Sequence, residues 1–84
     1  MFYIYFLKLN NNNIYTGFTK DLKRRFTEHK NGKVFFTKNK LPVKLIGYEA
    51  YKEKSDAIRR EKYMKTTEGK KLFRKQYKDI LQKV

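Results

Sequence analysis

The sequence predicts one domain of the α/β (α+β) class, a small three-stranded antiparallel sheet flanked by helices in the order β-β-α-β-α-α. Three observations support this prediction. Two short runs rich in Tyr, Phe and Ile near the start are separated by four consecutive Asn residues, a pattern typical of a β-hairpin. A third such run follows the single proline, and helical patterns lie before and after it. The 84 residues suffice for a single domain, residues 1–84, and are too few for two.

The first two predicted strands form the hairpin. Residues 2–9 place aromatic or aliphatic side chains on both alternating faces. A strand of this kind is usually covered on both sides, so we expect it at the centre of the sheet. Residues 14–19 form the second strand. The turn between them, residues 10–13, suits Asn because Asn tolerates positive φ, but four Asn residues permit several loop lengths and leave the register open.

The first helix is expected from about Asp21 to Lys30. Thr19 and Asp21 are both candidate N-caps, and Asp21 also suits the positive end of the helix dipole. Gly32 can adopt the left-handed conformation that commonly ends a helix. Residues 33–42 then form a basic loop.

The second half of the chain is predicted to hold one strand and two helices. The strand covers residues 43–51, directly after Pro42. Ser55 is the expected N-cap of a helix that reaches about Lys65. Thr67 is the expected N-cap of the last helix, whose inward stripe consists of Leu72, Phe73, Gln76, Tyr77, Ile80 and Leu81.

Charge indicates the class of partner. The formal net charge is +14, from 22 Lys and Arg against 8 Asp and Glu, and so small and basic a domain is drawn to polyanions such as nucleic acid. The alternative is a merely solvated basic surface, because the Lys, Asn, Ile, Tyr and Phe content is also what an AT-rich coding sequence favours. Without cysteine and with one histidine, the chain is not expected to hold a disulfide framework or a structural zinc site.

No apolar run approaches the roughly 20 residues that span a bilayer. The apolar start lacks a basic leader and a small-residue cleavage site, so it is not expected to be a signal peptide. We therefore expect a cytoplasmic protein without membrane contact.

Helical spacing places three polar side chains toward the interior. On the first helix His29 falls within the stripe of Leu22 and Phe26, with Arg25 at its edge. On the second, Glu61 falls in the middle of the inward arc. An inward carboxylate costs several kcal/mol, roughly, unless it is paired or binds a metal. A buried Arg25–Glu61 bridge with His29 as hydrogen-bonded neighbour and a functional site are both consistent with this arrangement.

Four segments then resemble one family in order and spacing. Tyr3-Ile4-Tyr5 and Tyr15-Thr16-Gly17 resemble the paired motif of the GIY-YIG endonuclease superfamily. Asp21 to His29 resembles its next motif, in which an Arg precedes a His by four, and Ala57 to Glu61 resembles the helix with its metal-binding Glu. The whole chain is similar to the small stand-alone, UvrC-like branch. It departs from the pattern at Tyr3, at Thr16, and at Phe73, where some members carry Asn.

The resemblance implies a mechanism. Glu61 would hold a divalent metal ion, expected to be Mg²⁺, and Arg25 would stabilise the charge of the transition state. Tyr5 or Tyr15 would orient or deprotonate the attacking water, and since a phenol titrates near 10, a base role requires a nearby cation. His29 would shuttle the proton or hydrogen-bond the Tyr.

Nucleic-acid contacts are expected outside these residues as well. Gly17 would let a phosphate approach its strand. Lys33, Lys38 and Lys40 would bind backbone phosphates, and Phe35 or Phe36 could stack on a base.

The predicted function is therefore a metal-dependent endonuclease that hydrolyses phosphodiester bonds of nucleic acid, DNA rather than RNA, with little sequence specificity. A partner protein could supply specificity. One alternative is a catalytically weak or inactive nucleic-acid-binding module of the same fold. Another is a basic structural protein with Arg25–Glu61 as a core bridge.

Overall fold

The computed structural model describes all residues, 1–84, and contains three strands and four helices. None of the helices is long and apolar enough to cross a bilayer. The elements are β1 (Phe2–Lys8), β2 (Ile14–Thr19), α1 (Leu22–Lys30), β3 (Lys44–Tyr51), α2 (Lys54–Met64), α3 (Thr67–Gln76) and α4 (Lys78–Lys83).

The three strands form an antiparallel sheet of order β2-β1-β3. The predicted antiparallel sheet is confirmed, as is the central position of the first strand. The hairpin register places Tyr5 opposite Gly17 on one side and Tyr48 on the other. In the turn, Asn12 has φ +69°, and the Asn11 side chain accepts a hydrogen bond from the Asn13 backbone N–H. The run of Asn therefore closes the hairpin as expected.

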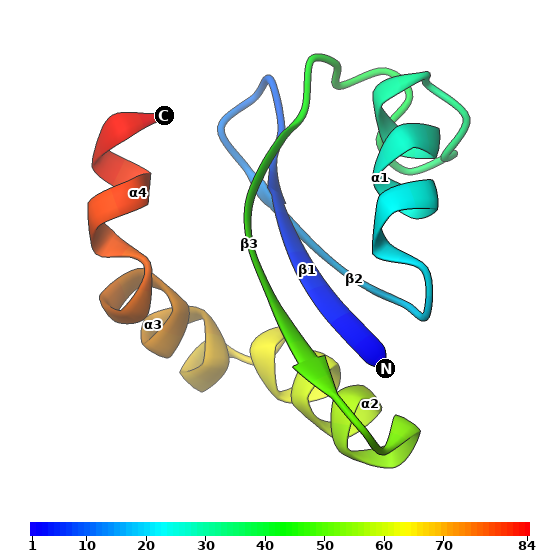
Figure 1. Cartoon of the computed structure of the whole chain (residues 1–84). Helices are drawn as coiled ribbons and strands as arrows, with labels where there is room; N and C mark the ends of the chain where they lie inside the picture. Colours follow the sequence, from blue (N-terminus) through cyan, green and yellow to red (C-terminus); the bar gives the residue numbers. More distant parts are fainter.

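The helices cover the two faces of the sheet unequally. Figure 1 shows α1 alone on one side, α3 and α4 on the other, and α2 across one end of the strands. The α2–α4 side holds the larger apolar cluster, built on Ile4 and Phe6 of the central strand. The α1 side holds a smaller cluster built on Tyr5 and Leu7. Consecutive residues of a strand point to opposite faces, so β1 supplies both cores.

Helix ends agree with the sequence near α1 and differ later. Asp21 caps α1 by accepting a hydrogen bond from the Arg24 N–H, and Gly32 has φ +71°. The expected caps at Ser55 and Thr67 are wrong: Glu53 and Thr66 precede these helices, and Thr66 Oγ1 accepts the Gly69 N–H.

Only two residues, Lys65 and Thr66, separate α2 from α3. A Cβ on Gly69 would overlap the backbone carbonyl of Tyr63. The two helices therefore approach so closely there that the chain turns over a very short segment.

The expected single last helix is wrong as well, because the chain breaks into α3 and α4 at Tyr77, which has φ −106° and ψ 25°. The ring of Tyr77 packs on Phe6 and Phe73, with centroid distances of 5.2 Å and 4.7 Å. It also fills the space beside Gly47, where a Cβ would lie 2.5 Å from the ring. The residue at which the helix breaks is thus the one whose ring packs into the core.

Candidate active site

A buried chain of three polar side chains forms the centre of the site. The Tyr5 hydroxyl and His29 Nε2 share a hydrogen bond of 2.8 Å, and His29 Nδ1 and Thr37 Oγ1 share another of 2.8 Å. The exposed fractions of Tyr5, His29 and Thr37 are 1%, 0% and 0%. Both ring nitrogens are occupied, so in the neutral ring one donates and the other accepts. These contacts fix the orientation of both rings.

His29 reaches this position because of helix geometry. It lies one turn after Arg25 and shares the buried face of α1 with Leu22 and Phe26, which pack on the smaller cluster. The predicted inward direction of His29 is confirmed by its burial. Burial, and then the positive charge of Arg25, lower the pKa of His29 from 6.5 to about 4. The imidazole is therefore neutral at pH 7.

The Tyr5 hydroxyl lies in a field of several charges. Burial raises its pKa from 10.0 to about 12. The neighbouring Arg25 guanidinium acts in the opposite direction, while Tyr15 and Glu61 add to the effect of burial. Side chains from β2, α1 and α2 therefore all influence the pKa of this hydroxyl on β1. The nearby cation that a base role requires is therefore Arg25.

Tyr15 extends the same cluster toward the surface. Its ring lies 5.2 Å from the His29 ring and 6.3 Å from the Tyr5 ring. It is half-buried, and its hydroxyl has no protein hydrogen-bond partner. Of the two tyrosines, Tyr15 can therefore contact water without breaking a hydrogen bond.

Gly17 makes room for Tyr5. It pairs with Tyr5 across the hairpin, and a Cβ at this position would overlap the end of the Tyr5 ring and its hydroxyl. Only glycine leaves that space free. Contact of Gly17 with a phosphate stays a prediction.

The two charged residues do not pair with each other. Arg25 Nη1 lies 3.1 Å from Glu28 Oε1, and Glu61 Oε2 lies 3.3 Å from Lys65 Nζ. The expected alternative of a buried Arg25–Glu61 bridge is therefore wrong. Each residue has a partner one turn away on its own helix, and such a pair needs no long-range docking.

The direction of Glu61 matches the expectation. Its side chain is 19% exposed, whereas that of Arg59 on the same helix is 73% exposed. The carboxylate is thus neither fully buried nor freely solvated, and it is close enough to Tyr5 to raise the pKa of that hydroxyl.

The donor set fits a hard divalent cation held jointly with a substrate. No three His, Cys, Asp or Glu side chains converge into a complete cage. Mg²⁺ is usually bound by one or two carboxylates together with waters and substrate phosphates. Glu61, half-buried and paired with a lysine at a single oxygen, supplies the one carboxylate that such binding requires.

The loop of residues 33–40 holds the side chains that the sequence predicts to contact nucleic acid, and that role stays a prediction. Phe35 and Phe36 are 71% and 68% exposed, and Lys38 Nζ lies 5.1 Å from the centre of the Phe35 ring. Lys33 is exposed and Lys40 is half-buried. The loop is tied to the active-site histidine through Thr37.

Thr37 is the residue that the sequence analysis missed. It stands in a loop without periodicity, between Phe36 and Lys38, and nothing in the sequence distinguishes it from the other threonines. Only the tertiary structure identifies Thr37, because there its hydroxyl is fully buried and a buried hydroxyl requires a hydrogen-bond partner.

Comparisons with known proteins show what this chain is similar to. The family model described as the GIY-YIG catalytic domain matches residues 1–78. A UPF0213 protein of Streptococcus agalactiae serotype V is 40% identical over 80 residues, covering 92% of this chain and 91% of that protein. Another, from Staphylococcus epidermidis, is 42% identical over 65 residues, covering 76% and 79%.

A solved structure is similar as well. The solution NMR structure of a UPF0213 protein from Bacillus halodurans has a TM-score of 0.56 and 31% identity, and the match covers 87% of this chain and 82% of that chain.

Proposed function

The chain belongs to the GIY-YIG family, and on that premise we propose that it is a metal-dependent endonuclease that hydrolyses phosphodiester bonds of nucleic acid, with DNA as the expected substrate. The observation that supports this most is the convergence of Tyr5, Tyr15, Arg25, His29 and Glu61 around one hydroxyl. A family resemblance alone gives a fold, whereas a function depends on the site.

The metal ion, bound by Glu61, would supply a Lewis acid that polarises the scissile phosphate and neutralises the leaving oxygen. Arg25, partly exposed, would contact the phosphate and stabilise the charge that develops on it, since a planar guanidinium matches phosphate oxygens. The Arg25–Glu28 pair would hold this guanidinium in place before substrate arrives.

The two tyrosines have different capacities. Tyr15 would orient the attacking water directly, because its hydroxyl is free. Tyr5 can accept a proton only when nearby positive charge outweighs the burial that raises its pKa to about 12. Arg25 already acts in that direction. The hydrogen bond between the Tyr5 hydroxyl and neutral His29 keeps that hydroxyl at a fixed place.

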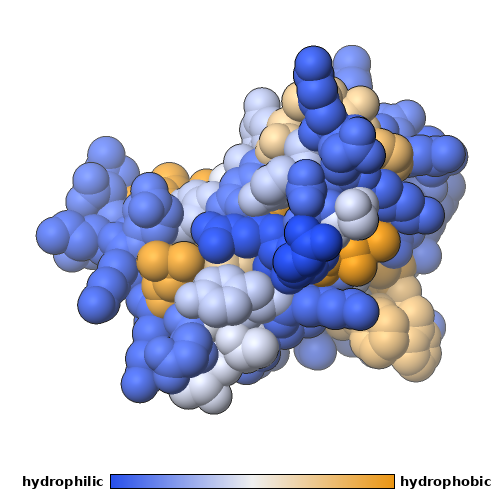
Figure 2. All heavy atoms as spheres, turned by 90° about the horizontal axis from the view of Figure 1, so that it is seen from below, coloured by the Kyte–Doolittle hydropathy of each residue, from blue (hydrophilic) through white to orange (hydrophobic).

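Binding is expected to be driven by charge. The net charge is +14, and Figure 2 shows a surface of mainly hydrophilic side chains with small, separate apolar patches. Phosphate contacts carry no sequence information, so we expect salt-sensitive binding with little base preference. A partner protein would be needed for sequence specificity.

The test is nicking of supercoiled plasmid with Mg²⁺ and with EDTA. Glu61→Gln and Arg25→Ala should each lower the rate at least about 10²-fold, because one removes the metal ligand and the other the phosphate cation. Asp56→Asn and Arg59→Ala are matched controls on α2, since this exposed pair lies away from the site, and both should nick normally. Thermal melts should show that all four variants remain folded.

A nucleic-acid-binding module of the same fold, without catalysis, is the second candidate. It is favoured by the Lys65 ammonium, which lies 3.3 Å from the carboxylate oxygen that a metal would need. Binding of plasmid without metal-dependent nicking at any Mg²⁺ concentration would establish this candidate and reject the endonuclease.

A further inference from the structure

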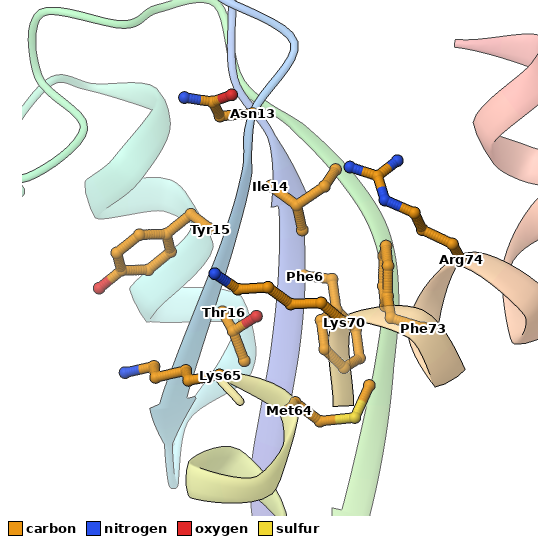
Figure 3. A pocket seen from close by; sticks show the side chains of 10 residues that line it. All are labelled: Phe6, Asn13, Ile14, Tyr15, Thr16, Met64, Lys65, Lys70, Phe73 and Arg74. Carbon is orange, nitrogen blue, oxygen red and sulfur yellow. The ribbon is translucent and has the colours of Figure 1, made fainter. Parts of the chain in front are cut away.

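A groove of about 540 Å³ lies beside the candidate active site, with β2 on one side and the end of α2 and the middle of α3 on the other. Its floor is apolar and includes Ile14, Met64 and Phe73. Its rim carries three cations, Lys65, Lys70 and Arg74, and no carboxylate lines it. Figure 3 shows these three side chains projecting from α2 and α3 toward β2.

The groove meets the site at one end and is otherwise separate from it. β2 is an edge strand, and the groove wraps around that edge, so it is lined both by Tyr15 from the α1 face and by Thr16 from the opposite face. Lys65, on its rim, contacts Glu61. A ligand in the groove would therefore continue directly into the site.

The rim cations are available to a ligand. Lys70 and Arg74 are exposed and take part in no ion pair. They lie one turn apart on α3, so their Cβ atoms are about 5–6 Å apart, and both can contact one flexible polyanionic strand. Two uncompensated cations beside the half-buried Ile14 match a sugar-phosphate backbone whose sugar or base contacts that side chain.

We propose that this groove binds the single strand that flanks the scissile phosphate, with backbone phosphates on Lys70 and Arg74. The direction in which the strand runs along the groove rests on the proposed function, since Tyr15 and Glu61 mark where cleavage would occur. It implies that the enzyme prefers substrates with an unpaired strand next to the cut.

The experiment measures binding of a fluorescein-labelled 12-nucleotide single strand in EDTA, so that cleavage plays no part. Lys70→Ala/Arg74→Ala should lower affinity at least about tenfold and reduce the slope of log K against log salt by about 1.4. The matched control is Lys71→Ala/Lys75→Ala, an exposed cation pair with the same spacing on the same helix that does not line the groove. It should change affinity less than about threefold.

Equal losses in the two double variants would overturn the proposal, since net charge alone would then explain binding. An NMR titration of the ¹⁵N-labelled protein with hexathymidylate gives an independent measurement. Shifts are expected in residues 14–16 and 64–74, whereas shifts confined to residues 33–40 would reject the groove. Displacement of the strand by poly-glutamate at equal charge concentration would also overturn it, because an acidic peptide would then fit equally well.

Failure of this inference is distinguishable from failure of the proposed function. If the wild type nicks plasmid and the Lys70→Ala/Arg74→Ala variant binds single strands normally, the groove is rejected and the endonuclease stands. If the groove binds as expected but Mg²⁺ never supports nicking, the groove stands and the endonuclease is rejected.

Discussion

The face of the sheet under α1 buries polar side chains, whereas the face under α2 and α3 buries almost only apolar ones. Under α1, Tyr5, His29 and Thr37 are at most 1% exposed and form a hydrogen-bonded chain. Under α2 and α3, the cluster contains Ile4, Phe6 and Met64, among others.

The opposite face has a polar network only at its margin. Glu49 accepts hydrogen bonds there from Tyr51, Arg60 and Tyr77, at 2.7 Å, 3.0 Å and 3.4 Å. Its side chain and that of Arg60 are 23% and 30% exposed, so water can replace part of what a substitution removes. The buried hydrogen-bonded chain therefore belongs to one face of the sheet, and the larger apolar core belongs to the other. A protein with so small a core maintains a buried polar chain only when every member is satisfied, and no buried side-chain polar atom lacks a partner.

The largest expected effect is at Gly17. An alanine there would collide with the end of the Tyr5 ring, and Tyr5 cannot move because it is buried and bonded to His29. Gly17→Ala should cost about 2–3 kcal/mol in the free energy of unfolding and abolish nicking. Chemical denaturation and the plasmid assay measure the two effects.

Gly47→Ala is the matched change on the other face, where the collision is with Tyr77 at 2.5 Å. Tyr77 is only half-buried at the junction of α3 and α4, so its ring can shift. We expect a loss of about 1 kcal/mol with normal nicking. Equal losses of activity in the two variants would contradict the separation of the faces.

Thr37→Val is expected to have the next largest effect. It preserves shape but leaves His29 Nδ1 without a partner, which costs about 1–3 kcal/mol. Because His29 positions Tyr5, the nicking rate should also fall, while Thr37→Ser should restore both stability and rate. A nicking rate unchanged in Thr37→Val would show that the histidine needs no second hydrogen bond.

The pH dependence of stability gives a smaller effect on the same face. The pKa of His29 is about 4 in the folded protein and 6.5 in its unperturbed state, so the unfolded chain binds more protons between these values. Stability should therefore fall by about 1.4 kcal/mol from pH 7.5 to pH 5.5. His29→Gln should flatten this profile, because the chain has one histidine. A pH dependence unchanged in the variant would show that other groups cause it.

The smallest effect is expected at Glu49. Glu49→Gln retains one acceptor oxygen but removes the charge that pairs with Arg60, which should cost about 1 kcal/mol or less. Nicking should be unchanged, since this network lies on the face opposite His29. A double-mutant cycle with Arg60→Ala measures the coupling, and lost activity would show that the two faces communicate.

Local patterns predicted most of the framework and part of the site. The inward directions of His29 and Glu61 follow from helical spacing alone, and the structure confirms them. A bridge between Arg25 and Glu61 was one of two alternatives that spacing allowed, and it is wrong, because Glu28 and Lys65, three and four positions away, are their partners. Helical spacing of three and four residues already favoured these local ion pairs over a pair between two helices.

The sequence by itself determined the hairpin, the start of the first helix near Asp21 and the buried faces of the helices, because each depends on residues within a few positions of one another. Only the tertiary structure decided that Thr37 would complete the histidine's hydrogen bonds, that Tyr77 would interrupt the last helix, and that a groove would open at the edge of β2. The reason is physical: burial, ring packing and cavity shape depend on segments distant in the chain, and their contacts exist only once the sheet has brought those segments together.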